Sequence, residues 1–174
     1  MGKLLAQELN LSFIDMDERL VTSFGKDILQ WVQSEGWKSF RKAESELLER
    51  LAREQGIVAA TGGGVVLSAH NRDLLKKHFL VIWLKASPET TYSRMLTDPA
   101  THTNRPAFTA LPLRKEIDKI LAERSGFYRE TAHIILETDG TSPEQLVSQV
   151  KSLVSQLDHA PGGSAAIFKN TTPE

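Results

Sequence analysis

The chain has 174 residues, 40% of them hydrophobic and 25% charged, which is typical of a single soluble globular domain. A formal net charge of −1 argues against non-specific nucleic-acid binding, and the lack of cysteine excludes disulfides, thiolate metal sites and thiol nucleophiles. No apolar run approaches the roughly 20 residues of a membrane helix, and the start lacks a signal-peptide pattern, so we expect a cytoplasmic protein.

Up to residue 55 the chain alternates between helical patterns and one short strand. We predict helices over residues 2–10, 17–24, 28–33 and 37–55, and a strand over residues 12–14. Asp15 and Asp17 follow this strand at its carboxyl end. In the helix over residues 37–55, Glu44 lies on the apolar side and Arg41 one turn before it. A surface ion pair explains their spacing but not the placement of the acid, which favours a role in a site.

The stretch over residues 57–66 organises the rest of the chain. Its apolar, partly β-branched first half predicts a strand over residues 58–60, buried in a parallel sheet. Gly62, Gly63 and Gly64 follow directly. Glycine permits positive φ and close approach to the backbone, and ligands of open α/β sheets bind beyond the carboxyl ends of strands. The three glycines therefore predict a ligand loop, with an ordinary glycine turn as the alternative.

The same alternation continues to residue 157. We predict helices over residues 69–77, 88–96, 113–129 and 143–157, and strands over residues 79–84 and 134–137. Residues 97–112, around Arg105, lack periodicity and have a length typical of a lid. Strict strand–helix alternation predicts an α/β fold of three layers, with a parallel sheet between helices on both faces. We expect one domain over residues 1–157 and a flexible tail over residues 158–174.

Charged residues gather at the predicted strand ends and loops. Asp15, Asp17, Arg105, Arg129 and the bare N–H groups of the glycines suit a small anionic polyol and a phosphate. Arginine grips a carboxylate or phosphate with two parallel hydrogen bonds. One aspartate can accept a hydroxyl proton, and the other can hold Mg²⁺, commonly through water.

In this order the residues resemble the landmarks of the shikimate kinase family, which has the P-loop kinase type of fold. The motifs are Phe13-Ile14-Asp15-Met16-Asp17, Phe40-Arg41-x-x-Glu44, Thr61 to Gly64, Arg105-Pro106 and Glu123-Arg124-x-x-x-Tyr128-Arg129. The resemblance covers about residues 1–155. It implies an ATP-dependent transferase that phosphorylates the 3-hydroxyl of shikimate in aromatic amino-acid biosynthesis.

The resemblance also assigns roles to the shikimate site. Asp17 would bind a shikimate hydroxyl and serve as the candidate base. Arg41 and Arg129 would hold the shikimate carboxylate, and Glu44 would orient Arg41. The pocket would be lined by Gly62, Gly63 and Gly64.

On the nucleotide side, the resemblance implies ATP and Mg²⁺ as ligands. Asp15 would hold Mg²⁺ through water, and Arg105 would reach the transferring phosphate when the lid closes. Arg94 and Pro143 match the region that contacts adenine. We expect a monomer that binds shikimate and ATP, and neither nucleic acid nor a membrane.

The printed sequence departs from the family in one respect above all, since it contains no G-x-x-x-x-G-K-[ST] motif. Gly2-Lys3 does not supply it, because no Ser or Thr follows. We therefore expect that the sequence starts inside the first helix, without the first central strand, and that the chain as printed is inactive. Two alternatives are a non-catalytic protein that binds a shikimate-like ligand or a partner, and a gluconate or nucleotide kinase of the same fold. The lid also carries Ala107-Phe108 where the family usually has two leucines.

Overall fold

The computed structural model describes residues 1–97 and 111–158, so most of the predicted lid and the tail from residue 159 lie outside the described residues. The helices are α1 (Gly2–Glu8), α2 (Met16–Phe24), α3 (Ile28–Leu51), α4 (Ala69–His78), α5 (Pro88–Thr97), α7 (Leu113–Thr131) and α8 (Pro143–Asp158), with a short 3₁₀ helix η1 (Val65–Leu67). The strands are β1 (Ser12–Asp15), β2 (Ile57–Ala60), β3 (Ile82–Lys85) and β4 (Ile134–Glu137).

All four strands lie in parallel pairs, as predicted, but they form two separate two-stranded sheets instead of the single sheet that was expected. β1 pairs with β2 from Ser12–Ile57 to Asp15–Ala60, and β3 pairs with β4 from Ile82–Ile134 to Lys85–Glu137. Within the described residues no ladder joins β2 to β3, so the sheet is divided into two pairs. β3 begins three residues later than predicted, because α4 extends to His78 and Phe79 caps it.

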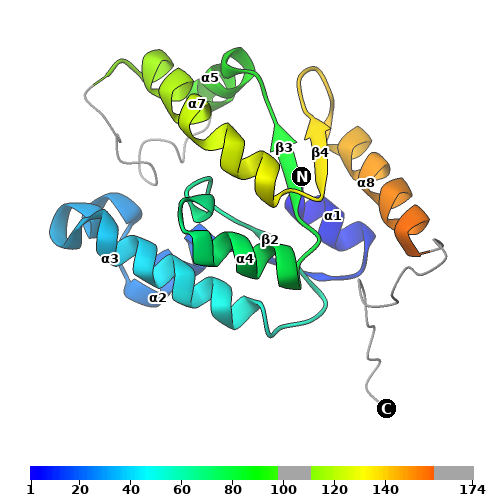
Figure 1. Cartoon of the computed structure of the whole chain (residues 1–174), viewed down its shortest axis with the longest axis horizontal. Helices are drawn as coiled ribbons and strands as arrows, with labels where there is room; N and C mark the ends of the chain where they lie inside the picture. Colours follow the sequence, from blue (N-terminus) through cyan, green and yellow to red (C-terminus); the bar gives the residue numbers. More distant parts are fainter. Residues whose placement is uncertain (98–110, 159–174) are drawn as a thin grey trace.

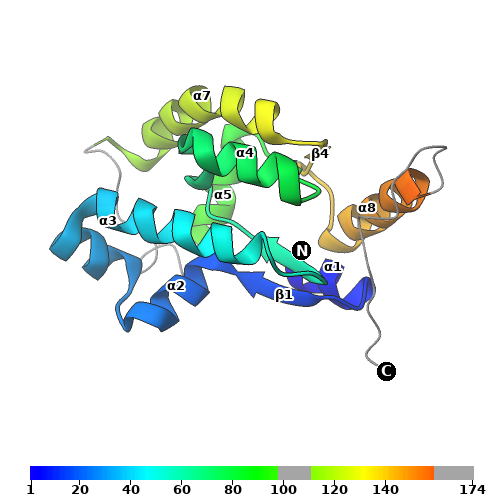
Figure 2. The same ribbon diagram turned by 60° about the horizontal axis from the view of Figure 1, so that its bottom comes forward.

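The strands lie between two groups of helices (Figures 1 and 2): α3, α4 and α7 on one side, and α1 and α8 on the other. One core cluster packs α2, α3 and α4 against β1 and β2, and its most buried members are Met16, Trp31, Leu48 and Leu51. A second cluster packs α1 and α8 around Leu136 of β4. The layered α/β class is therefore confirmed. In the part of the chain that the structure covers, no helix combines the length and apolarity that a bilayer crossing needs.

α3 is a single kinked helix, whereas the sequence predicted two separate helices over residues 28–33 and 37–55. Asp27 begins it with a capping box, in which its side chain accepts from the backbone of Gln30 and the Gln30 side chain accepts from the backbone of Asp27. Gly36 has φ 79° and ψ 165°, which kinks the helix at the predicted boundary. The helix ends at Leu51 rather than near residue 55, because the chain turns there toward β2.

Candidate active site

The carboxyl end of β1 supplies two aspartates to the site. Asp15 is the N-cap of α2, and its Oδ1 accepts from the backbone N–H of Asp17 at 2.9 Å and of Glu18 at 3.2 Å. Oδ2 of Asp15 has no hydrogen-bond partner within the described residues. Burial and then the charge of Asp15 raise the pKa of Asp17, which the Arg41 charge opposes.

α3 contributes a buried ion pair. Nη1 of Arg41 donates to Oε1 of Glu44 at 2.6 Å, and the Glu44 side chain is only 2% exposed. The guanidinium also lies over the rings of Trp37 and Phe40, at 5.1 and 5.2 Å from their centroids. Burial raises the pKa of Glu44 although Arg41 lowers it. The buried acid and its arginine, singled out by their spacing, therefore do meet.

Gly62, Gly63 and Gly64 lie directly against these side chains. A Cβ at Gly62 would come within 3.2 Å of an Asp17 carboxylate oxygen, and one at Gly64 would overlap the Arg41 guanidinium. None of the three has positive φ, and Gly64 has φ −88° and ψ −12°. Of the two properties of glycine considered from the sequence, positive φ therefore plays no part here. Close approach explains them, because a side chain at Gly62 would press on Asp17, one at Gly63 on the hydroxyl of Tyr128, and one at Gly64 on Arg41.

The end of α7 reaches the same loop. Oη of Tyr128 donates to the carbonyl of Gly63 at 2.7 Å, and Arg129 follows it on the exposed side of the helix. Arg124, one turn before Tyr128, is buried, and its charge lowers the pKa of Glu44. The structure therefore brings Asp17 and Arg41 together at the glycine loop and places Arg129 one residue from a loop contact.

The roles of Tyr128 and Arg124 were missed by sequence reasoning. Both fall on the apolar stripe of α7, and the polar atoms on that stripe were the signal that could have identified them. The Tyr128 bond spans 65 positions of sequence, so no local pattern could have given its partner.

Of the residues predicted to contact the nucleotide, Arg94 and Pro143 lie in neighbouring segments, and Arg105 cannot be compared with them. Arg94 of α5 donates from Nη1 to Oγ1 of Thr138 at 2.9 Å and from Nη2 to the Thr138 carbonyl at 2.8 Å. Pro143 opens α8 a few residues further on, so Arg94 and the β4–α8 turn are tied to each other. Arg105 lies outside the described residues. No group of three potential metal-binding side chains occurs within the described ranges.

A half-buried acid, a fixed arginine and a bare backbone loop meet at the carboxyl end of parallel strands. Such an arrangement is typical of the ligand sites of α/β enzymes, and its charges suit a small anionic polyol.

Comparison with known proteins narrows this class. A sequence profile described as "Shikimate kinase" matches residues 1–155. A relative named "Shikimate kinase 2" from Enterobacter sp. (strain 638) is 38% identical, over 86% of this chain and 84% of the relative. Another with that name, from Photorhabdus laumondii, is 35% identical over 88% of this chain and 86% of the relative. The chain belongs to the shikimate kinase family, as its motifs predicted, rather than to the gluconate or nucleotide kinases.

Solved structures agree with this assignment. Shikimate kinase from Acinetobacter baumannii, in complex with shikimate, has a TM-score of 0.83 and 29% identity, covering 91% of this chain and 87% of the other. Shikimate kinase from Bacteroides thetaiotaomicron has a TM-score of 0.77 and 26% identity, covering 90% and 89%. Both likenesses extend over nearly the whole chain, so they support the fold as well as the family.

Proposed function

We propose that this chain binds shikimate and transfers the γ-phosphoryl group of ATP to its 3-hydroxyl. The observation that carries the proposal is the contact of Asp17 and Arg41 with one loop, Gly62 to Gly64. An acid and an arginine beside one loop fit a ligand that has both hydroxyls and a carboxylate. The family assignment supports this ligand, and a solved relative is a complex with shikimate.

In the proposed reaction, Asp17 accepts the proton of the 3-hydroxyl. The hydroxyl oxygen bonds to the γ-phosphorus as the bond from that phosphorus to the bridging oxygen breaks, and ADP leaves. Arg41 and Arg129 hold the shikimate carboxylate, and Glu44 fixes Arg41 at 2.6 Å. Catalysis by these groups is mainly positioning, so the rigidity of the arginine matters as much as its charge.

On the nucleotide side, Asp15 is the proposed Mg²⁺ residue, because its Oδ2 is left over after Oδ1 caps α2. The bound ion would neutralise charge on the ATP phosphates. Arg105 is proposed to contact the transferred phosphate, and Arg94 and Pro143 the adenine. We also propose a cytoplasmic monomer without nucleic-acid or membrane partners. The net charge of −1 supports the exclusion of nucleic acid, and light scattering after gel filtration tests the monomer.

A second candidate is a protein that binds shikimate without phosphorylating it, which the absence of G-x-x-x-x-G-K-[ST] from the printed sequence favours. Loop N–H groups and the lysine of that motif neutralise the β- and γ-phosphates. Removing one such donor typically costs about 10²–10³ in rate. Several of these donors act as one unit, so their separate effects on the rate are not multiplied. We expect the 174-residue chain to transfer phosphate at least about a thousandfold more slowly than a chain that contains the motif.

A paired assay separates the two candidates. ADP release with shikimate and MgATP is measured for the 174-residue chain and for a chain extended upstream by a segment with the motif, after circular dichroism shows that both fold. Turnover by the extended chain alone supports a kinase whose printed sequence lacks the phosphate loop. Equal turnover would show that the phosphates bind elsewhere, for example at Gly2-Lys3. Shikimate binding by both chains without turnover by either would favour the binding protein.

A further inference from the structure

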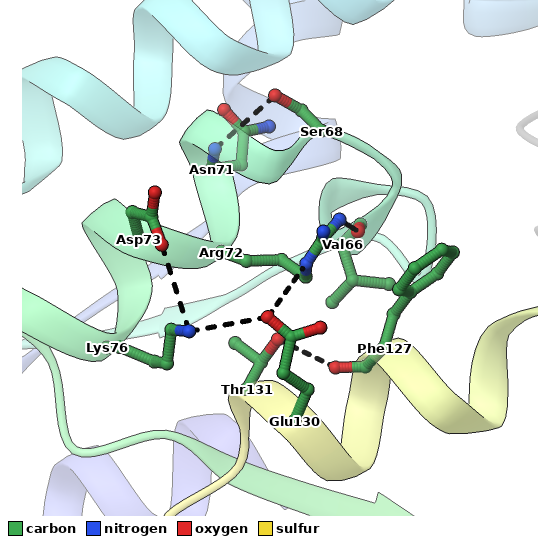
Figure 3. Close-up of polar contacts among 9 residues, drawn as sticks. All are labelled: Val66, Ser68, Asn71, Arg72, Asp73, Lys76, Phe127, Glu130 and Thr131. Carbon is green, nitrogen blue, oxygen red and sulfur yellow. Dashed lines mark hydrogen bonds and ion pairs between the residues drawn. The ribbon is translucent and has the colours of Figure 1, made fainter.

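The seam between α4 and α7 holds an arginine that the proposed reaction does not use (Figure 3). Nη1 of Arg72 donates to the carbonyl of Val66 at 2.8 Å, and Nε donates to Oε1 of Glu130 at 3.4 Å. The guanidinium lies over the ring of Phe127, 4.5 Å from its centroid. The Arg72 side chain is only 14% exposed, whereas that of Glu130 is 46% exposed, so the bond to the Val66 carbonyl is better shielded from water than the bond to Glu130.

The carbonyl to which Arg72 donates belongs to η1, which directly follows the glycine loop in the sequence and is hydrogen-bonded to it. The N–H of Val65 donates to the Gly62 carbonyl at 3.1 Å, and that of Leu67 donates to Gly64 at 3.0 Å. Asn71, the preceding residue of α4, donates from Nδ2 to the Val65 carbonyl at 3.1 Å and is buried. The first turn of α4 thus holds two successive carbonyls just beyond the loop.

The remaining contacts of Arg72 lie on the last turn of α7. Phe127 and Glu130 stand on either side of Tyr128 and Arg129 in the sequence. Tyr128 itself bonds to the glycine loop. One guanidinium therefore bridges the segment that follows the loop and the helix end that carries a predicted carboxylate-binding arginine.

We propose that Arg72 is a positioning residue for shikimate, which sets the placement of the glycine loop relative to the end of α7. A glycine loop has no side chains to pack, so its shape depends on its backbone hydrogen bonds. A bond from a guanidinium to a carbonyl is stronger than one between neutral groups, and it is shielded here. This inference rests on the proposed shikimate site, since it explains how that site keeps its shape.

Lys76 provides the contrast, because it shares the carboxylate but not the carbonyl. Its Nζ lies 3.3 Å from Oε1 of Glu130 and 3.7 Å from Asp73, and its side chain is 37% exposed. Within the described residues it bonds to no carbonyl of η1. Exposed pairs of this kind contribute little. If the ion pair with Glu130 were the whole function of Arg72, then removing either cation would have similar effects.

The experiment compares Arg72→Met, Arg72→Lys and Lys76→Met with the unsubstituted chain. Methionine keeps an apolar stem beside Phe127 but removes both hydrogen bonds, whereas lysine keeps the charge without the planar fork. Calorimetric titration with shikimate gives the Kd, and thermal melting gives the midpoint. Hydrogen exchange of peptides that cover residues 61–67 reports on the loop without any ligand.

We expect Arg72→Met to weaken shikimate binding at least about tenfold and to speed exchange in residues 61–67, with Arg72→Lys in between. Lys76→Met stays within about twofold on both readouts. A lower melting midpoint with unchanged Kd and loop exchange would show a purely structural role and overturn the inference. If the unsubstituted chain does not bind shikimate, the proposed function fails, and loop exchange alone then decides the role of Arg72. Should Arg72→Met not fold, Arg72→Lys against Lys76→Met gives the same comparison.

Discussion

Gly64→Ala is expected to weaken shikimate binding strongly while the backbone fold is retained. Gly64 has φ −88° and ψ −12°, which alanine adopts without strain, so the backbone tolerates the change. The new methyl group, however, would overlap three atoms of the Arg41 guanidinium. The guanidinium is the end of a flexible side chain, and it is therefore the group that moves.

The size of the effect follows from that displacement. The guanidinium must shift by about 1 Å to reach ordinary van der Waals contact, which begins near 3.4 Å. Glu44 is buried and cannot follow, so the 2.6 Å bond between the two side chains opens. Loss of one charged hydrogen bond costs about 1.5–3 kcal/mol, and the misplaced guanidinium no longer meets the carboxylate of shikimate. We expect a loss of about 3 kcal/mol in binding, or roughly a hundredfold in Kd.

Calorimetric titration with shikimate measures this effect, and Gly126→Ala is the matched control. Gly126 is a glycine of α7 with nothing within 4 Å of its Cβ position. Alanine there gains helix propensity and raises stability by up to about 1 kcal/mol, while the Kd stays unchanged. Unchanged affinity in Gly64→Ala, with the fold intact by circular dichroism, would refute the placement of Arg41 in the shikimate site.

Three further changes test the charges and the scaffold. Asp17→Asn should abolish the turnover of the chain extended with the phosphate-loop motif, yet raise the melting midpoint of the 174-residue chain at pH 7. Burial raises the folded-state pKa of Asp17 above 3.8, so the ionised carboxylate weakens the fold above that raised pKa. Melts of the substituted and unsubstituted chains should converge as the pH falls toward 3.8, and a lower midpoint at pH 7 would contradict this sign. Glu44→Gln should likewise preserve or raise the melting midpoint, since the pKa of Glu44 is also raised. It should weaken shikimate binding about tenfold, because Arg41 loses the charge of its ion-pair partner. Calorimetric titration of the folded variant tests this, and unchanged affinity would show that Glu44 does not orient Arg41. Asp27→Ala removes the capping box of α3 and should cost about 1 kcal/mol in urea unfolding with no change in shikimate affinity, which a stability loss near zero would contradict.

Elements with local signals were predictable from the sequence. Gly25, with φ 67°, ends α2, Asp27 caps α3, and Pro88 is the first residue of α5, so residue type accounts for the start or end of each helix. Glu44 on an apolar stripe correctly predicted a buried acid paired with Arg41. In each case the interacting residues are close together in the sequence, so a local sequence pattern is enough to predict the structure.

The remainder depends on contacts between distant segments. β3 begins at Ile82 because α4 keeps Phe79 as its cap, although residues 79–84 are uniformly apolar. η1 was not predicted, since its carbonyls are held by Asn71 and Arg72 rather than by a local repeat. The glycines required the coordinates too, because their reason is the proximity of Asp17 and Arg41 and not their own backbone angles.

The charges around Arg41 give a reason for the contact between α7 and the glycine loop. Asp17 and Glu44 both lie within reach of the Arg41 charge, Asp15 adds a negative charge near Asp17, and the pKa values of Asp17 and Glu44 are both raised. An anionic ligand that entered beside Arg41 alone would meet net negative charge even if one of these acids were protonated. Within the described residues, α7 adds positive charge, because it brings Arg124 near Glu44 and carries Arg129 beside the loop contact. The affinity for a carboxylate therefore depends on how α7 is held as well as on which arginines it carries.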